Sequence, residues 1–260
     1  MGKQRNIQRN DGRKTRNRNY RQEIGEKELY LSDKHKQQRE EFIKNNPIAP
    51  LNLKQARYME LLENKKCVLA TGLCGTSKTY IPTATFADWY RMGKIKKIVV
   101  IRPAMSSSKT VGLFKGSVAE KCSVWAAPVI DVLNKRLGKA ATNMAIERGD
   151  IEFVPLEVVK GRSFDEDCAV LVTEAEDCTI EECISLTTRN GGCHMVIEGD
   201  ATYQSCLGKN NGLYQLLKLA NENPKLQEFV GVVSFDDISD IVRSKECREW
   251  VKVFTKAGYM

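Results

Sequence analysis

Short apolar runs alternate with longer amphipathic segments over most of the chain. Several runs are dense in Val and Ile and lack polar alternation, which predicts strands buried on both faces. The runs are 66–70, 97–101, 151–154, 168–173, 194–198 and 229–234. Segments with helical periodicity lie between or after them, at 78–92, 117–137, 179–188, 212–220 and 244–255. This alternation predicts an α/β fold in which helices cover a parallel sheet.

The first part of the chain differs in composition from the rest. Residues 1–22 hold eight basic residues and one acid, a net charge of +7, whereas the whole chain carries +8. This basic arm has few apolar residues, so we expect it to be disordered or helical and to bind nucleic acid through phosphate contacts. A solvated tail without a partner is the alternative. A polar helix is expected over 33–45, and a second helix after Pro50. We therefore expect an arm with a polar helix at 1–48 and one domain at 49–260.

Length and composition argue against several protein classes. The 260 residues suffice for one large domain, and 42% hydrophobic with 28% charged residues is ordinary for a globular protein. No apolar run approaches the ~18 residues of a membrane span, and no apolar stretch follows the basic N-terminus as in a secretory signal. The nine cysteines include no C-x-x-C pair and are expected to be reduced thiols. We expect a cytoplasmic protein without a membrane partner.

A glycine-containing loop joins the first predicted strand to the next helix, with the sequence Thr-Gly-Leu-Cys-Gly-Thr-Ser-Lys-Thr at 71–79. In such a unit, backbone N–H groups and the helix N-terminus bind a polyphosphate, Lys78 reaches the terminal phosphates and Thr79 offers a hydroxyl to Mg²⁺. Ser77 occupies the second glycine position of the G-x-x-x-x-G-K-[ST] pattern. If that position needs a left-handed backbone, a side chain there costs about 1–2 kcal/mol. An ordinary glycine turn before a helix is the alternative.

Another predicted strand runs into an acidic segment, Val170–Asp177. In the second half of a phosphate site, such a strand supplies a metal-side Asp followed by a Glu that polarises the attacking water. Thr173 stands in the Asp position and Glu174 in the Glu position. Threonine can hydrogen-bond a metal-bound water but adds no negative charge, and loss of such a group weakens metal sites about 10–100-fold. A strand that ends in a solvated acidic loop is the alternative.

Short motifs follow one another in an order that resembles the PhoH-like ATPases. The chain from about Pro50 to Phe254 is similar to this family, especially to the short single-domain versions of tailed bacteriophages. If a phage encodes the chain, its cytoplasmic location is that of the host. The motifs are Leu53–Tyr58, Gly72–Thr79, Ile101–Pro103, Val111–Gly116 with Glu120-Lys121, Gly161–Phe164, Thr188-Arg189, Gly199-Asp200 and Asp240–Ser244.

The resemblance implies a three-layer, RecA-like P-loop NTPase fold, similar to the nucleotide-binding core of superfamily-one helicases, with ATP and Mg²⁺ as ligands. It implies that Gln55 reads adenine and that Asp200 lies at the nucleotide. The nucleotide-binding residues expected in all are Gln55, Gly72, Cys74, Gly75, Thr76, Ser77, Lys78, Thr79 and Asp200. The expected metal residues are Thr79 and Thr173, and the expected catalytic residues include Glu174 and Lys78. Helicases of this type close a cleft between two cores, so this single core implies a homo-oligomer, of which a hexameric ring is one form.

Arginines beside apolar segments are further candidates, because a guanidinium can clamp phosphate or act across a subunit boundary. Among Arg102, Arg162, Arg189 and Arg243 we favour Arg189 and Arg243 as catalytic, with a surface ion pair as the alternative for each. Phe114 lies between glycines and is a candidate for stacking on a base. The expected nucleic-acid-binding residues are Arg13, Lys14, Arg16, Arg18, Phe114 and Arg162.

Departures from the family pattern gather where the chemistry would occur. Ser77 replaces a glycine, Thr173 an aspartate, and Glu176 and Tyr203 each replace a glutamine. Two functions therefore stay open. One is a Mg²⁺-dependent ATPase that acts on RNA or single-stranded DNA. The alternative is a degenerate, non-hydrolysing module that binds nucleotide and nucleic acid.

Overall fold

The computed structural model describes residues 34, 36–103, 118–205 and 207–260. By its contacts the chain divides into two units, Met1–Pro47 and Ile48–Met260. In the first unit, residues 36–45 are helical, within the polar helix expected there. The basic arm and Phe114 lie outside the described residues, so their predicted contacts with nucleic acid stay predictions.

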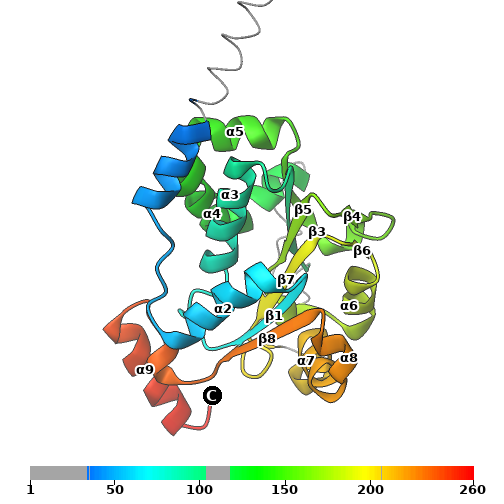
Figure 1. Cartoon of the computed structure of the whole chain (residues 1–260). Coiled ribbons are helices and arrows are strands. Elements are labelled where there is room, and N and C mark those ends of the chain that lie inside the picture. Colours follow the sequence, from blue (N-terminus) through cyan, green and yellow to red (C-terminus); the bar gives the residue numbers. More distant parts are fainter. Residues whose placement is uncertain (1–33, 35, 104–117, 206) are drawn as a thin grey trace, which may run out of the picture. The chain divides into compact units, whose positions relative to one another are not determined.

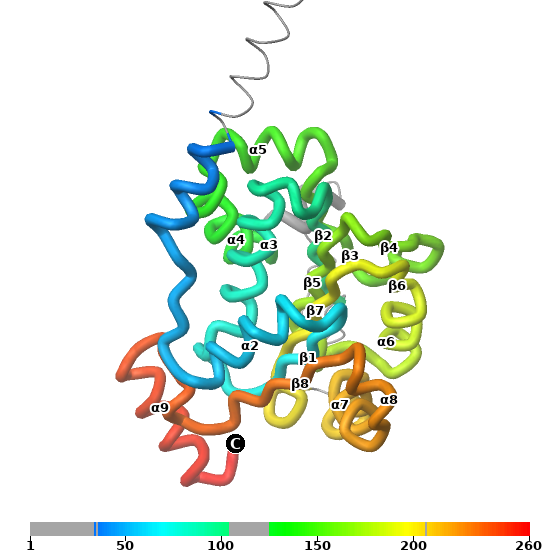
Figure 2. Tube along the Cα trace, viewed as in Figure 1, coloured from blue at the N-terminus to red at the C-terminus, as the bar shows by residue number. Residues whose placement is uncertain are grey.

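The second unit contains a six-stranded sheet in which all neighbouring strands are parallel, in the order β3-β2-β5-β7-β1-β8 (Figures 1 and 2). Each strand coincides with one of the apolar runs to within two residues, which confirms the predicted parallel sheet. The strands are β1 (Cys67–Gly72), β2 (Lys97–Arg102), β3 (Ile151–Pro155), β5 (Cys168–Val172), β7 (His194–Gly199) and β8 (Val230–Phe235).

Helices cover both faces of this sheet and form three layers with it (Figure 1). One face carries α2 (Leu53–Asn64), α3 (Tyr80–Met92), α4 (Val118–Leu137) and α5 (Lys139–Glu147). The other face carries α6 (Ile180–Thr187) and α7 (Gly212–Glu222), followed by the short α8 (Pro224–Gln227). The last helix, α9 (Lys245–Lys256), packs beside the 3-10 turn Ile238–Asp240. The α/β three-layer prediction is therefore confirmed.

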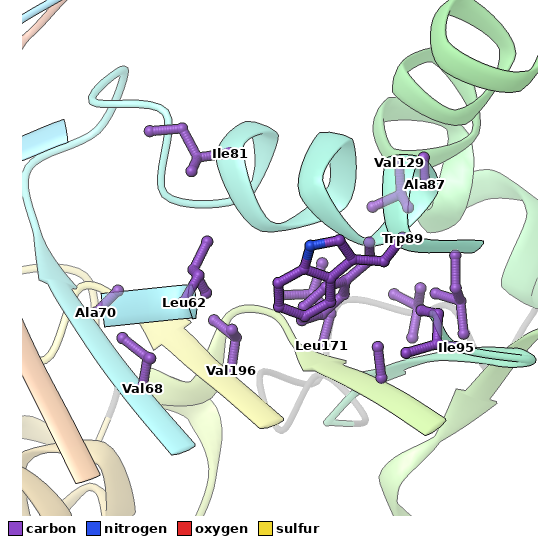
Figure 3. Packing of buried hydrophobic residues seen from close by; sticks show 14 of the residues in the cluster. Leu62, Val68, Ala70, Ile81, Ala87, Trp89, Ile95, Val129, Leu171 and Val196 are labelled. Atoms are coloured by element: carbon purple, nitrogen blue, oxygen red, sulfur yellow. The ribbon is translucent and has the colours of Figure 1, made fainter. Parts of the chain in front are cut away.

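Alternate residues of the strands enter two separate cores. On β1, Val68 packs on the α2–α5 side, whereas Leu69 packs on the α6–α7 side. Figure 3 shows the first core, in which the Trp89 ring of α3 lies over Leu171 and Val196 of the sheet. Because both faces are covered by helices, the strands need no polar side, which explains their continuous apolar sequence.

A few elements were not expected from the sequence. The amphipathic segment 117–137 stops at Gly138, whose φ is +90°, and α5 then begins at once. Two-residue strands, β4 (Phe164–Asp165) and β6 (Asn190–Gly191), form a small second sheet. A strand of two residues carries no periodicity and leaves no pattern to detect. Among the described residues no helix has both the length and the apolar character that crossing a bilayer requires.

Candidate functional site

The loop between β1 and α3, Leu73–Thr79, follows the carboxyl end of a strand in the interior of the sheet and is called the phosphate loop below. Its backbone reverses at Gly75, with φ +73°, and at Ser77, with φ +74°. Ser77 is thus held in the left-handed conformation that the missing glycine would adopt without strain. The condition for the strain considered from the sequence, a left-handed backbone at Ser77, is therefore met.

The phosphate loop is fixed from behind by α2 and by the segment before α9. The Gln55 amide donates to the Thr76 carbonyl over 3.1 Å, and the Tyr58 hydroxyl donates to the Lys78 carbonyl over 3.1 Å. The Val242 N–H donates to the Gly75 carbonyl over 2.9 Å. One of the two amide N–H groups of Gln55 therefore supports the loop, and its predicted adenine reading stays a prediction.

Lys78 lies back over the phosphate loop. Its ammonium donates to the carbonyl oxygens of Gly72 over 2.7 Å and of Leu73 over 2.8 Å. Neutral carbonyls are weaker partners for an ammonium than phosphate oxygens, because only the phosphate oxygens carry a negative charge that attracts the cation. A polyphosphate in the loop can therefore replace these contacts, as the predicted role of Lys78 requires.

A buried carboxylate meets the hydroxyl of Thr79. The Thr79 Oγ1 donates to Oε1 of Glu198 over 2.8 Å, and Glu198 is 4% exposed near the end of β7. Burial raises the pKa of Glu198 to about 7, although Lys78 and the Thr79 hydroxyl act in the opposite direction. The sequence placed Glu198 at the end of a strand and assigned it no function; its proximity to Thr79 is a finding of the structure.

Glu174 follows β5 at the same edge of the sheet. Its φ is +54°, and its carboxylate lies 4.0 Å from the guanidinium of Arg102, which ends β2. Thr173, just before it, is 7% exposed and donates its N–H to the Ile101 carbonyl. Lys78 and Arg102 lower the pKa of Glu198 and Glu174 raises it, although none of the described residues forms an ion pair with Glu198. Arg102 was considered from the sequence but not favoured.

Asp200 and Arg243 lie beside this site in different ways. The Asp200 carboxylate accepts hydrogen bonds from the N–H groups of Thr202 and Tyr203, and its Oδ2 is buried without a partner among the described residues. Arg243 packs closely on the phosphate loop: a Cβ added at Gly75 would lie 2.9 Å from the Cβ of Arg243. Asp200 therefore orders the turn after β7. Arg243 lies at the phosphate loop, and its predicted catalytic role stays a prediction.

Remaining loop residues have structural contacts of their own. The Thr76 hydroxyl donates to the Leu73 carbonyl over 2.9 Å and is buried in the loop. The thiols of Cys74 and Cys247 lie 3.9 Å apart. These two loop residues lie where the sequence placed them, and their predicted contact with nucleotide stays a prediction.

Arg189 and Arg162 lie away from the phosphate loop. Arg189 directly precedes β6 and donates to the Arg162 carbonyl over 3.3 Å, while Arg162 pairs with Glu152. The small sheet of β4 and β6 precedes β5 and β7, so it lies at their amino ends, opposite the edge that carries Lys78. Arg189 can therefore meet a nucleotide only across a subunit boundary, and its predicted catalytic role depends on an oligomer.

Removing the Ser77 side chain is expected to stabilise the protein. The Ser77→Gly variant relieves a left-handed non-glycine residue, which costs about 1–2 kcal/mol, and part of this gain is lost to the greater freedom of glycine in the unfolded chain. We expect a net gain of about 1 kcal/mol in the free energy of unfolding, measured by urea denaturation. Ser77→Ala keeps the Cβ and should bring no gain; equal stability of Ser77→Gly and the unchanged chain would contradict the prediction.

Comparison with known proteins agrees with this geometry. A family model described as PhoH-like protein matches residues 47–255. The chain is 31% identical over 214 residues to Protein PhoH of Escherichia coli (strain K12), covering 81% of this chain and 59% of that protein. It is 30% identical over 221 residues to the PhoH-like protein of Bacillus subtilis (strain 168), covering 84% and 68%. The chain thus spans well under two thirds of the Escherichia coli relative. It belongs to the PhoH-like protein family.

Proposed function

We propose that this chain is a Mg²⁺-dependent ATPase that acts with RNA or single-stranded nucleic acid. The observation that carries the proposal is the phosphate loop, a double left-handed turn at the carboxyl edge of a parallel sheet that leads into α3. Such a loop directs backbone N–H groups and a helix N-terminus at an anion. Membership of the family supports the same assignment, because it implies a nucleotide-binding P-loop protein.

The residues at this edge fit a nucleotide with Mg²⁺. The Thr79 hydroxyl and a buried carboxylate lie 2.8 Å apart, and both are the oxygen ligands that Mg²⁺ prefers. No cluster of three or more His, Cys, Asp or Glu side chains suited to a metal occurs in the described part of the chain. A nucleotide site needs none, since Mg²⁺ there takes one or two carboxylates along with phosphate oxygens and water.

Each side chain then has a part in hydrolysis. Lys78 binds the terminal phosphates, Thr79 holds the metal, and Glu174, half-exposed at the end of β5, orients the attacking water. Bound Mg²⁺ supplies positive charge that neutralises the charge developing on the phosphates. Among the residues that the structure describes, Arg102 and Arg243 are arginines that lie near this site within one copy of the chain.

The nucleic-acid partner and the oligomer are proposed on separate grounds. Residues 1–22, with a net charge of +7, provide phosphate contacts whose strength falls steeply as salt rises. A homo-oligomer would bring Arg189 of one copy to the nucleotide of another. In this proposal residues 1–48 bind nucleic acid and the domain at 49–260 binds and hydrolyses ATP.

The Lys78→Ala variant tests the proposed function. We expect ATP affinity in the presence of Mg²⁺ to fall about 10–100-fold in titration calorimetry, because a charged hydrogen-bonding partner of the phosphates is lost. Phosphate release, measured with and without RNA, should fall to background. The matched control is Lys139→Ala, which removes an exposed lysine of α5 and should leave both readings unchanged.

The outcome also separates the two functions left open by the sequence. If the unchanged chain binds ATP but releases no more phosphate than Lys78→Ala, the chain is a non-hydrolysing module, as Ser77 and the neutral Thr173 would favour. If neither chain binds ATP, the proposed function is wrong.

A further inference from the structure

We infer that Glu198 supplies the carboxylate of the magnesium site in place of the Asp that Thr173 has displaced. The metal site of this chain would then take its acid from β7, beside β1, and not from β5. This inference rests on the proposed function, because it concerns the metal that accompanies the nucleotide.

The first argument is the chemistry that Thr173 cannot provide. Phosphate-loop enzymes hold Mg²⁺ with the Ser or Thr of the loop and an Asp from another segment of the chain. Thr173 is neutral, so it contributes no charge to the metal, and the carboxylate beside it, Glu174, is half-exposed and turned toward Arg102. A site built from Thr79 and Thr173 alone would lack a negative charge.

The second argument is the contact that Glu198 already makes. Its Oε1 accepts the proton of the Thr79 hydroxyl over 2.8 Å. This hydrogen bond leaves the lone pairs of the Thr79 oxygen free to bind a cation, and it places the carboxylate immediately behind that oxygen. A carboxylate in this position orients the ligand and raises the local negative charge, as outer-shell groups of metal sites do.

The third argument is the strand order. β7 lies between β1 and β5, and its register pairs Ala70 with Glu198 on one side and Val172 with Ile197 on the other. Thr173 follows Val172 and Glu198 follows Ile197, so Thr173 and Glu198 are neighbours across the two adjacent strands. Compared with the Asp position after β5, the acid lies on the adjacent strand β7. This places it next to β1, the strand that leads into the phosphate loop.

The fourth argument is the environment of the carboxylate. Glu198 is 4% exposed, and no Lys, Arg or His within 4.0 Å pairs with it among the residues that the structure describes. Burying a carboxylate without a paired charge is costly. A divalent cation at Thr79 would offset that cost, so the unpaired acid is placed where such an ion is expected.

A structural role is the competing explanation, in which Glu198 only fixes the Thr79 rotamer. The two roles differ in one respect. If the role is structural, a neutral side chain at position 198 can make the same hydrogen bond to Thr79, and an acid at position 173 cannot replace it. If the role is to supply charge to the metal, a neutral side chain at position 198 fails, and an acid at position 173 can take over.

The test uses Mn²⁺ as a paramagnetic substitute for Mg²⁺ and a non-hydrolysable ATP analogue, with the full chain. Glu198→Gln keeps an acceptor for Thr79 and removes the charge. We expect the Mn²⁺ affinity of the nucleotide complex, read from the free-Mn²⁺ electron paramagnetic resonance signal, to fall at least about tenfold. Nucleotide affinity measured in EDTA should change less than twofold. Adding Thr173→Asp to Glu198→Gln should restore Mn²⁺ affinity.

Other results would overturn the inference. If the unchanged chain binds nucleotide and Glu198→Gln has the same Mn²⁺ affinity, the inference is wrong and the proposed function stands. If the unchanged chain binds no nucleotide with or without metal, both fail. Should Glu198→Gln not fold, the exchange variant Glu198→Thr with Thr173→Asp returns the acid to β5; Mn²⁺ affinity near that of the unchanged chain supports the inference, and its loss contradicts it.

Discussion

Replacing Gly72 with alanine is expected to destabilise the protein by about 4 kcal/mol, because two separate costs combine. The φ of Gly72 is +124°, which a residue with a Cβ adopts only under strain. A Cβ at this position would also lie 2.3 Å from the carbonyl oxygen of Phe235, well inside contact distance. Urea denaturation of the purified variant measures the loss.

The clash cannot be relieved by a side-chain rotation, because the atoms met belong to the backbone of β8. Gly72 and Phe235 are paired in the β1–β8 register, and the Leu73 N–H donates to the same Phe235 oxygen over 2.9 Å. The last pair of the ladder therefore anchors the first residue of the phosphate loop. Relief requires β1 and β8 to separate at the point where the loop begins.

A second glycine separates the two costs. Gly138 has a φ of +90°, and an added Cβ there would meet nothing within 4 Å. Gly138→Ala should therefore cost only the conformational part, about 1–2 kcal/mol. Equal losses for Gly72→Ala and Gly138→Ala would contradict the close approach of β1 and β8 and would mean that the phosphate loop is not anchored at Phe235.

The sheet was predictable because each strand is buried on both faces. An apolar run such as that of β2 carries its own signal, and no detail of packing is needed to detect it. The same reasoning explains what was missed. The two-residue strands β4 and β6 have no period, and α5 is separated from α4 only by the left-handed Gly138.

The site was predictable where it is local and not where it depends on strand order. Lys78 and Thr79 belong to one short loop, so their spacing alone predicts a phosphate-binding role for them. Glu198 lies 119 residues from its partner Thr79, and only the placement of β7 beside β1 brings them together. The arrangement of the strands also decides at which edge of the sheet an arginine lies. Arg102 ends β2 at the carboxyl edge, beside the site, whereas Arg189 lies at the amino ends of the strands.

The buried carboxyl of Glu176 gives the second large effect. Glu176 is 3% exposed, and its Oε2 accepts the N–H of Asp200 over 3.1 Å. Burial, followed by the hydrogen bond and the charge of Glu174, raises the pKa of Glu176 to about 8. Near neutral pH it is therefore largely protonated, and its O–H donates to Glu174 as the amide of a glutamine would.

This shift makes stability depend on pH with a definite sign. Between the ordinary glutamate pKa of about 4.3 and the raised value, the folded protein holds a proton that the unfolded chain releases. The contribution of Glu176 to stability is therefore complete below pH 4 and declines as the pH rises to about 8. Glu176→Gln removes this titration and keeps both hydrogen bonds.

We expect Glu176→Gln to match the unchanged chain in urea denaturation at pH 4.5 and to exceed it by about 4 kcal/mol at pH 8. Comparing the two chains at each pH cancels the titration of the other carboxyls. Glu157→Gln, at an exposed glutamate, should show no such divergence.

A constant difference between Glu176→Gln and the unchanged chain over this pH range would mean that Glu176 is ionised in the folded protein. Two carboxylates, those of Glu174 and Glu176, would then repel each other at the edge of the sheet that carries the phosphate loop. This result would contradict the conclusion that Glu176 is protonated and donates a hydrogen bond to Glu174. A divergence that grows with pH instead shows that the glutamate at this position imitates, through its proton, the glutamine that the family pattern has there.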